Sequence, residues 1–356
     1  MKGLLKSAWK PALAVAMAAG LCWLLLAFSG YDAGLGFTSL YEATFKNLRM
    51  FGNMLNKACP LLFCGLAVGF SFRGNVFNLG ADGQFLMGAV AATWVGIALS
   101  SLPGFLLIPA IMIAGALGGA LWGLCPGYFK ARYQVPEVIT TIMFNHIALQ
   151  FVAYLVRYPL KDTTQINPQS APIAAQGQLG YMLEGTKLHA GFLAGCIIAL
   201  LIFFLLFKTY LGFEIRSVGY NRVAAKFGGV NISRMTVATM LISGALAGLG
   251  GAFEIAGSSH YLYEVISSGY GYTAIAVAIL AMNNPIGIVF SALLFGFLNA
   301  GTTAMQRAIN VSASFVDLFQ VIIIIFVAIA TVATKYKSRP TLKKSGLKFL
   351  SKKEVA

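Results

Sequence analysis

Residues Glu214 to Arg234 read EIRSVGYNRVAAKFGGVNISR, a polar, basic and glycine-punctuated stretch. Apolar runs at 189–207 and 235–256 flank it, and each is long enough to cross a membrane. The stretch is too short to form an enzyme domain. Its residues 224–228 predict a short helix with a face of small side chains, which would fit into a groove on another protein. We therefore expect a loop at 208–234 through which a partner acts on the apolar segments.

The composition extends this interpretation to the whole chain. Of its 356 residues, 58% are hydrophobic and only 10% are charged. Soluble domains average about 45–50% apolar and about 25% charged residues. Because the apolar excess runs along the entire sequence, we expect an all-α, polytopic membrane bundle.

A helix needs about 20 predominantly apolar residues to cross the hydrocarbon core of a bilayer. Ten segments approach this requirement, although the eighth is short, and a count of eight spans is the main alternative. The candidate spans are 11–28, 53–72, 84–100, 104–126, 138–157, 189–207, 235–256, 270–282, 285–305 and 315–334.

The basic residues predict the orientation of these spans. Ten spans with the N-terminus inside leave 19 of the 26 Lys and Arg residues on the cytoplasmic side, the bias that membrane proteins show. We therefore expect a membrane domain at 1–334, cytoplasmic termini and a basic tail at 335–356 that contacts anionic lipid. The net charge of +15 sits in loops and tails rather than on a polar domain, which argues against nucleic-acid binding.

Two parts of the chain resemble one another. Residues 78–87 (NLGADGQFLM) and 269–282 (GYGYTAIAVAILAM) are glycine-rich polar openings to a span, each followed by a proline and a Gly/Ala-rich helix. The sets are spans 2–5 and 7–10, offset by five, so they would run through the membrane in opposite directions. Inverted repeats of this kind are a plan of membrane transporters. Ordinary Gly/Pro punctuation of membrane helices is the alternative.

Several chemistries lack their residues. The sequence has no phosphate-binding GxxxxGK[ST] loop, no HExxH and no GxSxG. Its three histidines have no ligand spacing, and its five cysteines lie in or beside apolar segments without a CxxC pair. We expect a protein that is not an enzyme and that binds no metal or cofactor itself.

Three polar side chains, Asn78, Asp82 and Gln84, accompany Gly80 and Gly83 near membrane depth. Irregular backbone at such depth is tolerated only beside protein or water, and polar side chains there are candidates for a transport path. The alternative is a cytoplasmic turn in which Asp82 caps a helix.

Three further residues complete the candidate path. Glu137 either caps the helix that follows Pro136 or lines a route, and Asn145 lies about two turns deeper. Tyr272 is one of the aromatic residues beside the glycine-rich openings, which would suit a planar substrate, although an interfacial aromatic belt explains it too.

Four stretches in order resemble one known family, the permease subunits of bacterial ABC importers of the branched-chain amino acid and ribose type. RGNVFNLGADGQFLMGA resembles its FNIGAEGQ-type signature, and PEVITTIMFNHIA resembles a stretch of its nucleoside and simple-sugar subgroup. RSVGYNRVAAKFGGVNISR is similar to its cytoplasmic coupling segment, and GYGYTAIAVAILAMNNPIG to a fourth motif. Asp82 stands where Glu is usual, which keeps the charge and shortens its reach.

This resemblance implies a type II ABC importer-like bundle, in which two permeases pair as homo- or heterodimers. Two cytoplasmic ATPases would bind ATP and magnesium, and an extracytoplasmic binding protein would deliver the solute. The implied location is a bacterial plasma (inner) membrane, and the implied cargo a nucleoside. The coupling residues carried over are Gly219, Asn221, Ala224, Ala225 and Gly228.

Alternative functions differ in cargo or in energy source. The same machine could carry a simple sugar or a branched-chain amino acid. A secondary transporter driven by an ion gradient would instead need titratable groups deep in several spans, whereas most acidic residues here lie near span ends.

Overall fold

The computed structural model describes residues 2–182 and 186–312, together with residues 315, 318, 319, 321, 322, 325, 326 and 329. Helices dominate these residues, and their only β-type pairing is three isolated bridges. The elements are α1 (Lys2–Phe28), α2 (Ala33–Phe45), α3 (Leu48–Arg73), α4 (Ala81–Ala98), α5 (Gly104–Tyr133), α6 (Glu137–Arg157), η1 (Ala175–Gly177), α7 (Gly191–Lys208), α8 (Tyr210–Tyr220), α9 (Arg222–Phe227), α10 (Ile232–Glu254), η2 (Ile255–Ser259), α11 (Tyr270–Leu280) and α12 (Pro285–Ile309).

Each of the first nine expected spans coincides with a helix. Within the part of the chain that the structure describes, six helices are long and apolar enough to cross a membrane, namely α3, α5, α6, α7, α10 continued through η2, and α12. The expected eighth span is indeed short, since α11 has only 11 residues. The expected tenth span, 315–334, and the tail at 335–356 lie largely or wholly outside the described residues.

Two local expectations need correction. Residues 33–45, which lie between the first two expected spans and for which we expected no helix, form the separate helix α2, capped by the Asp32 side chain. Residues 208–234 are mainly helical rather than a loop, because Thr209 and Asn221 cap the starts of α8 and α9. An N-cap side chain satisfies backbone N–H groups that would otherwise lack partners, so each of these polar residues starts a helix.

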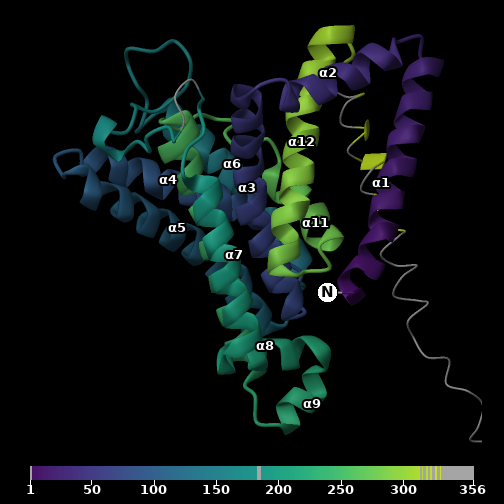
Figure 1. Cartoon of the computed structure of the whole chain (residues 1–356). Coiled ribbons are helices and arrows are strands. Elements are labelled where there is room, and N and C mark those ends of the chain that lie inside the picture. The colour runs from purple at the N-terminus through teal and green to yellow at the C-terminus, as the bar shows by residue number, and fades with distance from the viewer. Residues whose placement is uncertain are drawn as a thin grey trace, which may run out of the picture.

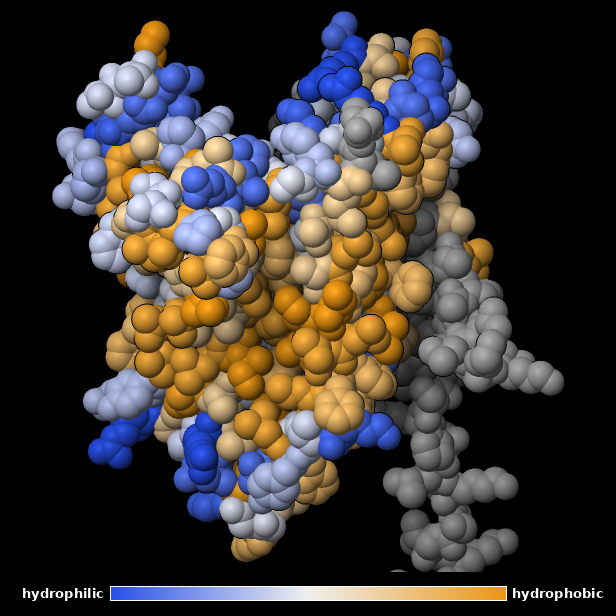
Figure 2. All heavy atoms as spheres, turned by 60° about the vertical axis from the view of Figure 1, so that its left-hand side comes forward, coloured by the Kyte–Doolittle hydropathy of each residue, from blue (hydrophilic) through white to orange (hydrophobic). Residues whose placement is uncertain are grey.

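The centre of the bundle is built by α3 and α10. In their most apolar windows, 78% of the residues of α3 and 67% of those of α10 with η2 are buried, against 22% for α5 and 28% for α6. The first two helices therefore form the core, whereas α5 and α6 turn apolar side chains outward. Figure 2 shows the resulting apolar belt between two polar ends.

The contacts of the two halves correspond to one another. Helix α3 packs against α11 and α12, and α10 packs against α4 and α5. Arg73, at the end of α3, lies against Gly219 of α8, and α10 begins shortly after α9, so α3 and α10 run in opposite directions. This pattern agrees with the expected inverted repeat.

Small residues allow α5 and α10 to approach closely. A Cβ atom at Gly119 would overlap the carbonyl oxygen of Gly244, and one at Gly248 would overlap that of Gly115. Packing rather than hydrophobicity holds helices together in lipid, so these glycines set the distance between the two helices.

The two ends of the bundle differ. Helices α8 and α9 project from one end, toward which the N-terminal end of α1 also points (Figure 1). The loop between α6 and α7 and the helix α2 lie at the opposite end. We call these the α8–α9 end and the α2 end.

Candidate functional site

The predicted path residues begin in the irregular segment between α3 and α4. The Asn78 side chain is fully buried and donates hydrogen bonds to Gln84 Oε1 (2.9 Å) and to Ser243 Oγ on α10 (2.7 Å). Ser243 in turn donates to the carbonyl of Ala67 on α3 (2.7 Å). One amide thus ties the segment to both central helices.

Asp82 joins the starts of two short helices. Its Oδ1 accepts hydrogen bonds from the Ser267 hydroxyl (2.6 Å) and from the backbone N–H of Gly271 (2.9 Å). Asp82 lies in the first turn of α4, and Gly271 in the first turn of α11. Helix N-termini carry partial positive charge, so one carboxylate stabilises both starts. One of our two alternatives was that Asp82 caps a helix. The helix start whose N–H group donates to it is that of α11, in the other half of the chain.

Asn145 of α6 completes this network. Its Oδ1 accepts from the Gly83 N–H (2.9 Å), and its Nδ2 donates to the Leu79 carbonyl (2.8 Å) and to the Tyr272 hydroxyl (3.1 Å). Five of the six predicted path residues therefore make their hydrogen bonds on or around the segment 78–84, in three neighbouring sets that we call the central polar network: Asn78, Asp82, Gln84, Asn145 and Tyr272.

Glu137 lies apart from the other five. Its carboxylate forms an ion pair with Lys130 at the end of α5 (2.8 Å) and accepts a long hydrogen bond from the Phe77 N–H (3.5 Å). The Glu137 side chain is therefore held at the α5–α6 junction, next to the segment that leads into the central polar network.

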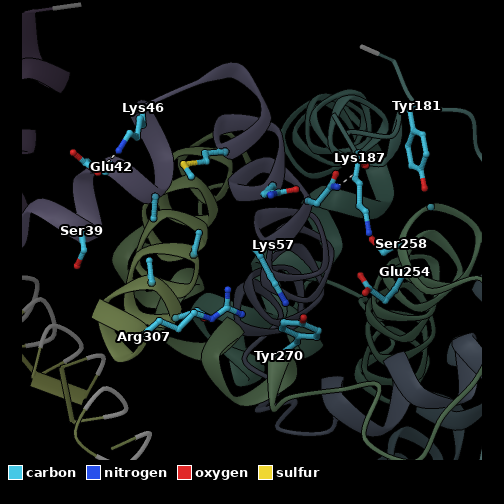
Figure 3. A pocket seen from close by; sticks show the side chains of 18 residues that line it. Ser39, Glu42, Lys46, Lys57, Tyr181, Lys187, Glu254, Ser258, Tyr270 and Arg307 are labelled. Carbon is cyan, nitrogen blue, oxygen red and sulfur yellow. Dashed lines mark hydrogen bonds and ion pairs between the residues drawn. The ribbon is translucent and has the colours of Figure 1, made fainter. Parts of the chain in front are cut away.

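A cavity of about 510 Å³ opens toward the α2 end. Residues of α2, α3, α12 and the end of α10 line it, and none of the six predicted path residues does so. Figure 3 shows Arg307, Lys57, Tyr270 and Glu254 in a row across this cavity. Binding sites for small molecules typically measure about 300–1,000 Å³, so its size suits a small solute.

The floor of this cavity meets the central polar network through α11. Tyr270 is 7% exposed and lines the cavity, whereas Gly271, the next residue, donates to Asp82. The cavity and the network are thus neighbours along the start of α11, and the network, buried except for the 44% exposed Tyr272, lies beneath the open cavity.

Neutral His189 supports the cavity wall. Its ring is 1% exposed; Nδ1 accepts from the Gly191 N–H (3.0 Å), and Nε2 faces the Ser258 hydroxyl (3.3 Å). Burial, and secondarily the nearby His260, lowers the pKa of His189 to about 4. A Cβ atom at Gly257 would lie 2.5 Å from this ring, so only glycine leaves room for the histidine against η2.

A second candidate surface lies at the α8–α9 end. Tyr220, Val223 and Phe227 expose 81%, 65% and 89% of their surface there. Large apolar side chains so exposed on an otherwise polar end indicate a contact surface for another protein. We call these three residues with Ala224 the α9 surface.

The five predicted coupling residues fall into two groups, those at the surface of α9 and those packed against the bundle. Asn221 caps α9, and Ala224 and Gly228 are exposed. Ala225 is buried, and Gly219 packs against the carbonyl oxygen of Arg73, where a Cβ atom would overlap it. The last two therefore hold α8 and α9 onto the bundle instead of facing outward. Sequence reasoning overlooked Tyr220 and Val223.

A hydrogen bond links α9 to the central polar network. Arg222 Nη2 donates to the Asn75 carbonyl (3.0 Å), three residues before Asn78. Arg73 similarly donates to the carbonyls of Asn283 (2.8 Å) and Met282 (3.2 Å), at the far end of α11. The segment 73–82 thus connects helix α9 with both ends of α11, since Arg222 and Arg73 bond at its beginning and Asp82 bonds the start of α11.

Comparison with known proteins gives a consistent result. The profile of a family described as "Branched-chain amino acid transport system / permease component" matches residues 50–328. The guanosine ABC transporter permease protein NupP of Bacillus subtilis is 37% identical over 89% of this chain and 91% of its own length. The nucleoside ABC transporter permease protein NupB of Lactococcus lactis is 33% identical over 86% of each chain. The glucose ABC transporter permease protein TsgB13 of Haloferax volcanii is 33% identical over 80% of this chain and 77% of its own.

Proposed function

This chain belongs to the family of branched-chain amino acid transport system permease components, and on that basis we propose that it is the membrane subunit of an ATP-driven nucleoside importer. Two relatives whose names specify nucleosides, NupP and NupB, align over most of the chain and support this cargo.

The energy source lies outside this chain. The family implies an ATP-driven system with a partner ATPase, and the sequence has no phosphate-binding loop. ATP and magnesium would therefore be bound by the ATPase subunits. A partner of this kind moves a membrane protein by binding two of its conformations with different affinities.

The observation that carries the proposal is the α9 surface. Its exposed apolar side chains lie on the short capped helix α9 and at the end of α8, and these two helices are anchored to the bundle through Gly219, Ala225 and Arg222. We propose that the ATPase docks there, at Asn221, Ala224 and Gly228, while Gly219 and Ala225 transmit the motion into the bundle.

The solute path would start in the cavity at the α2 end and pass through the central polar network. In this proposal Asn78, Asp82, Gln84, Asn145 and Tyr272 form the closed section beneath the cavity, and Glu137 lies beside its exit. Opening would require their hydrogen bonds to exchange partners, because these side chains are paired in the present conformation.

The same machine with a simple sugar as cargo is the second candidate. The relative named for glucose supports it at 33% identity. A nucleoside and glucose both carry a hydroxylated sugar ring, so the two candidates share one chemical feature.

The proposed permease would work as part of a larger assembly. A second permease, identical or related, would complete a dimer, and an extracytoplasmic binding protein would deliver solute at the α2 end. The chain would lie in a bacterial plasma (inner) membrane with both termini in the cytoplasm.

Uptake of labelled nucleosides tests the proposed function. Cells that carry the chain, its ATPase and its binding protein should accumulate nucleosides, and deletion of this chain alone should abolish the uptake. Unchanged uptake of every nucleoside after deletion would refute the cargo. Nucleoside uptake by the purified chain alone in liposomes, driven by an ion gradient without ATP, would refute the coupling to an ATPase.

A further inference from the structure

The charged residues of the cavity at the α2 end have no role in the network described above. Lys57 lies nine residues after the start of α3, roughly 13 Å along the helix axis. A charged side chain within a membrane-spanning helix generally faces a partner or a water-filled cavity and marks a functional site. Lys57 is exposed, and it lines the cavity.

Glu254 provides a complementary group across the cavity. It is the last residue of α10 and precedes the π-helical turn η2. Its Oε1 accepts a hydrogen bond of 3.4 Å from Ser259. Among the described residues, Lys57 and Glu254 form no ion pair within 4.0 Å with each other or with any other residue. The two charges therefore face the same cavity without neutralising one another directly.

The wall contains a further unused group. Asn56 donates to the Lys187 carbonyl (2.6 Å), but its buried Oδ1 has no hydrogen-bond partner. By contrast, Glu42 and Lys46 pair with each other at 2.7 Å on the same cavity. Lys57, Glu254 and Asn56 therefore keep hydrogen-bonding capacity that no other described residue uses, as does Arg307 on the same wall, whose guanidinium makes no hydrogen bond or ion pair with a described residue.

These three groups select a particular chemistry. An ammonium group only donates hydrogen bonds, a carboxylate only accepts them, and the Asn56 oxygen accepts. A hydroxyl group can do both, so two adjacent hydroxyls satisfy a donor on one side and an acceptor on the other. A solute that offers only a donor would leave the Lys57 ammonium unpaired, and one that offers only an acceptor would leave the Glu254 carboxylate unpaired. Either case would weaken binding.

From this arrangement we infer that Lys57 and Glu254 form a binding site for the sugar of the cargo, in which adjacent ring hydroxyls bridge the two charges. The inference rests on the proposed function, because it assumes that a ribose-bearing solute enters this cavity. One hydroxyl accepts a hydrogen bond from Lys57, and its neighbour donates one to Glu254. Tyr270 closes the site toward the start of α11.

Binding of two matched probes to the purified full-length chain, in complex with its partner subunits, tests this site. The probes are tritiated inosine and 2′,3′-dideoxyinosine, which differ only in the two ribose hydroxyls. We expect the wild type to bind inosine about 10- to 100-fold more tightly, as hydrogen bonds to charged groups would give. Glu254→Gln and Lys57→Met should each reduce inosine affinity toward that of the dideoxy probe and leave dideoxyinosine binding within about twofold.

For each variant, the ratio of the affinities for the two probes does not depend on the amount of folded protein, because both probes are measured on the same preparation. Glu264→Gln is the control, because Glu264 is paired with Arg157 (2.9 Å) and does not line the cavity. It should bind both probes as the wild type does. Equal affinity of the wild type for the two probes, or equal weakening of both by Glu254→Gln, would overturn the inference.

The uptake test described for the proposed function distinguishes a failure of this inference from a failure of the function. If inosine is imported in an ATP-dependent manner but the hydroxyls make no difference to binding, only the sugar site is wrong. If no nucleoside is imported at all, both the function and the site fall.

Discussion

The carboxylate of Asp82 accepts a hydrogen bond of 2.9 Å from the backbone N–H of Gly271, 189 positions later in the sequence. The contact joins the N-termini of α4 and α11, the two helices that the expected internal repeat would relate. Both helix starts carry partial positive charge, and this carboxylate serves both. Any movement that separates the two halves at this level must break the contact.

Replacing Asp82 should therefore destabilise the bundle. Asp82→Ala leaves the Ser267 hydroxyl and the Gly271 N–H without their acceptor, which should lower the free energy of unfolding by about 1–3 kcal/mol. Asp82→Asn keeps an acceptor oxygen and should cost less. Thermal unfolding of the purified variants in detergent measures the difference. Equal losses for both variants would contradict a role for the hydrogen bonds, and a changed KM for uptake at unchanged stability would instead place Asp82 in contact with solute.

Arg222→Ala should weaken the connection between ATPase and path. The variant removes the hydrogen bond to the Asn75 carbonyl but leaves the α9 surface unchanged. We expect the ATPase to co-purify normally while the uptake rate falls by roughly 2- to 30-fold, the range of coupling energies of about 0.5–2 kcal/mol. Lys226→Ala, which changes an exposed basic residue on the same helix, is the control. A loss of co-purification in Arg222→Ala would show that the residue acts in docking.

Gly228→Glu should block docking without disturbing the fold. A Cβ atom at Gly228 would meet only carbonyl oxygens of α9 at 3.4 and 3.5 Å, which is ordinary contact. The variant should insert normally, lose the ATPase on purification and lose ATP-dependent uptake. Gly180→Glu, at an exposed site with nothing within 4 Å of its Cβ on the loop before α7, should keep the ATPase. Normal uptake by Gly228→Glu would remove Gly228 from the coupling surface.

Gly119→Val should prevent α5 from packing against α10. The added side chain would overlap the Gly244 carbonyl, and overpacking of this kind costs about 1–3 kcal/mol or more. We expect a strongly reduced yield of monodisperse protein in size-exclusion chromatography. Gly20→Val introduces the same side chain in α1, where nothing lies within 4 Å, and should behave as the wild type. Similar yields for the two variants would contradict the close approach of the helices.

The stability of the protein should decrease in acid because of His189. The folded protein holds the pKa of His189 near 4, below the ordinary value of 6.5. The unfolded chain therefore binds the proton first as pH falls, and stability is lost between about pH 6.5 and 4, by at most about 1.4 kcal/mol per unit. His189→Asn, which keeps an acceptor for the Gly191 N–H, should flatten the dependence of the melting temperature on pH across this window. A slope as steep as that of the wild type would assign the effect to other groups.

The candidate path shows where sequence reasoning reaches its limit. Polar residues at membrane depth are exceptional, so Asn78, Asp82 and Asn145 could be selected one by one. Their partners could not, because Ser243, Ser267 and Gly271 are small residues of kinds that occur throughout membrane helices. Lys57, a charged residue within the expected span 53–72, carries a comparable signal, but its position opposite Glu254 across a cavity is visible only in the structure.

The apolar runs, the basic bias and the four motifs were enough to predict the membrane bundle, most of its helices and its family. This is possible because a bilayer requires apolar helices of a minimum length and an uneven distribution of basic residues, and both can be recognised in the sequence. Which residues meet across the bundle depended on folding in space. The start of α11 reaches Asp82, Ala225 turns inward and Lys57 faces Glu254 because helices far apart in sequence pack at distances set by glycines and carbonyl groups, and no local pattern encodes those distances.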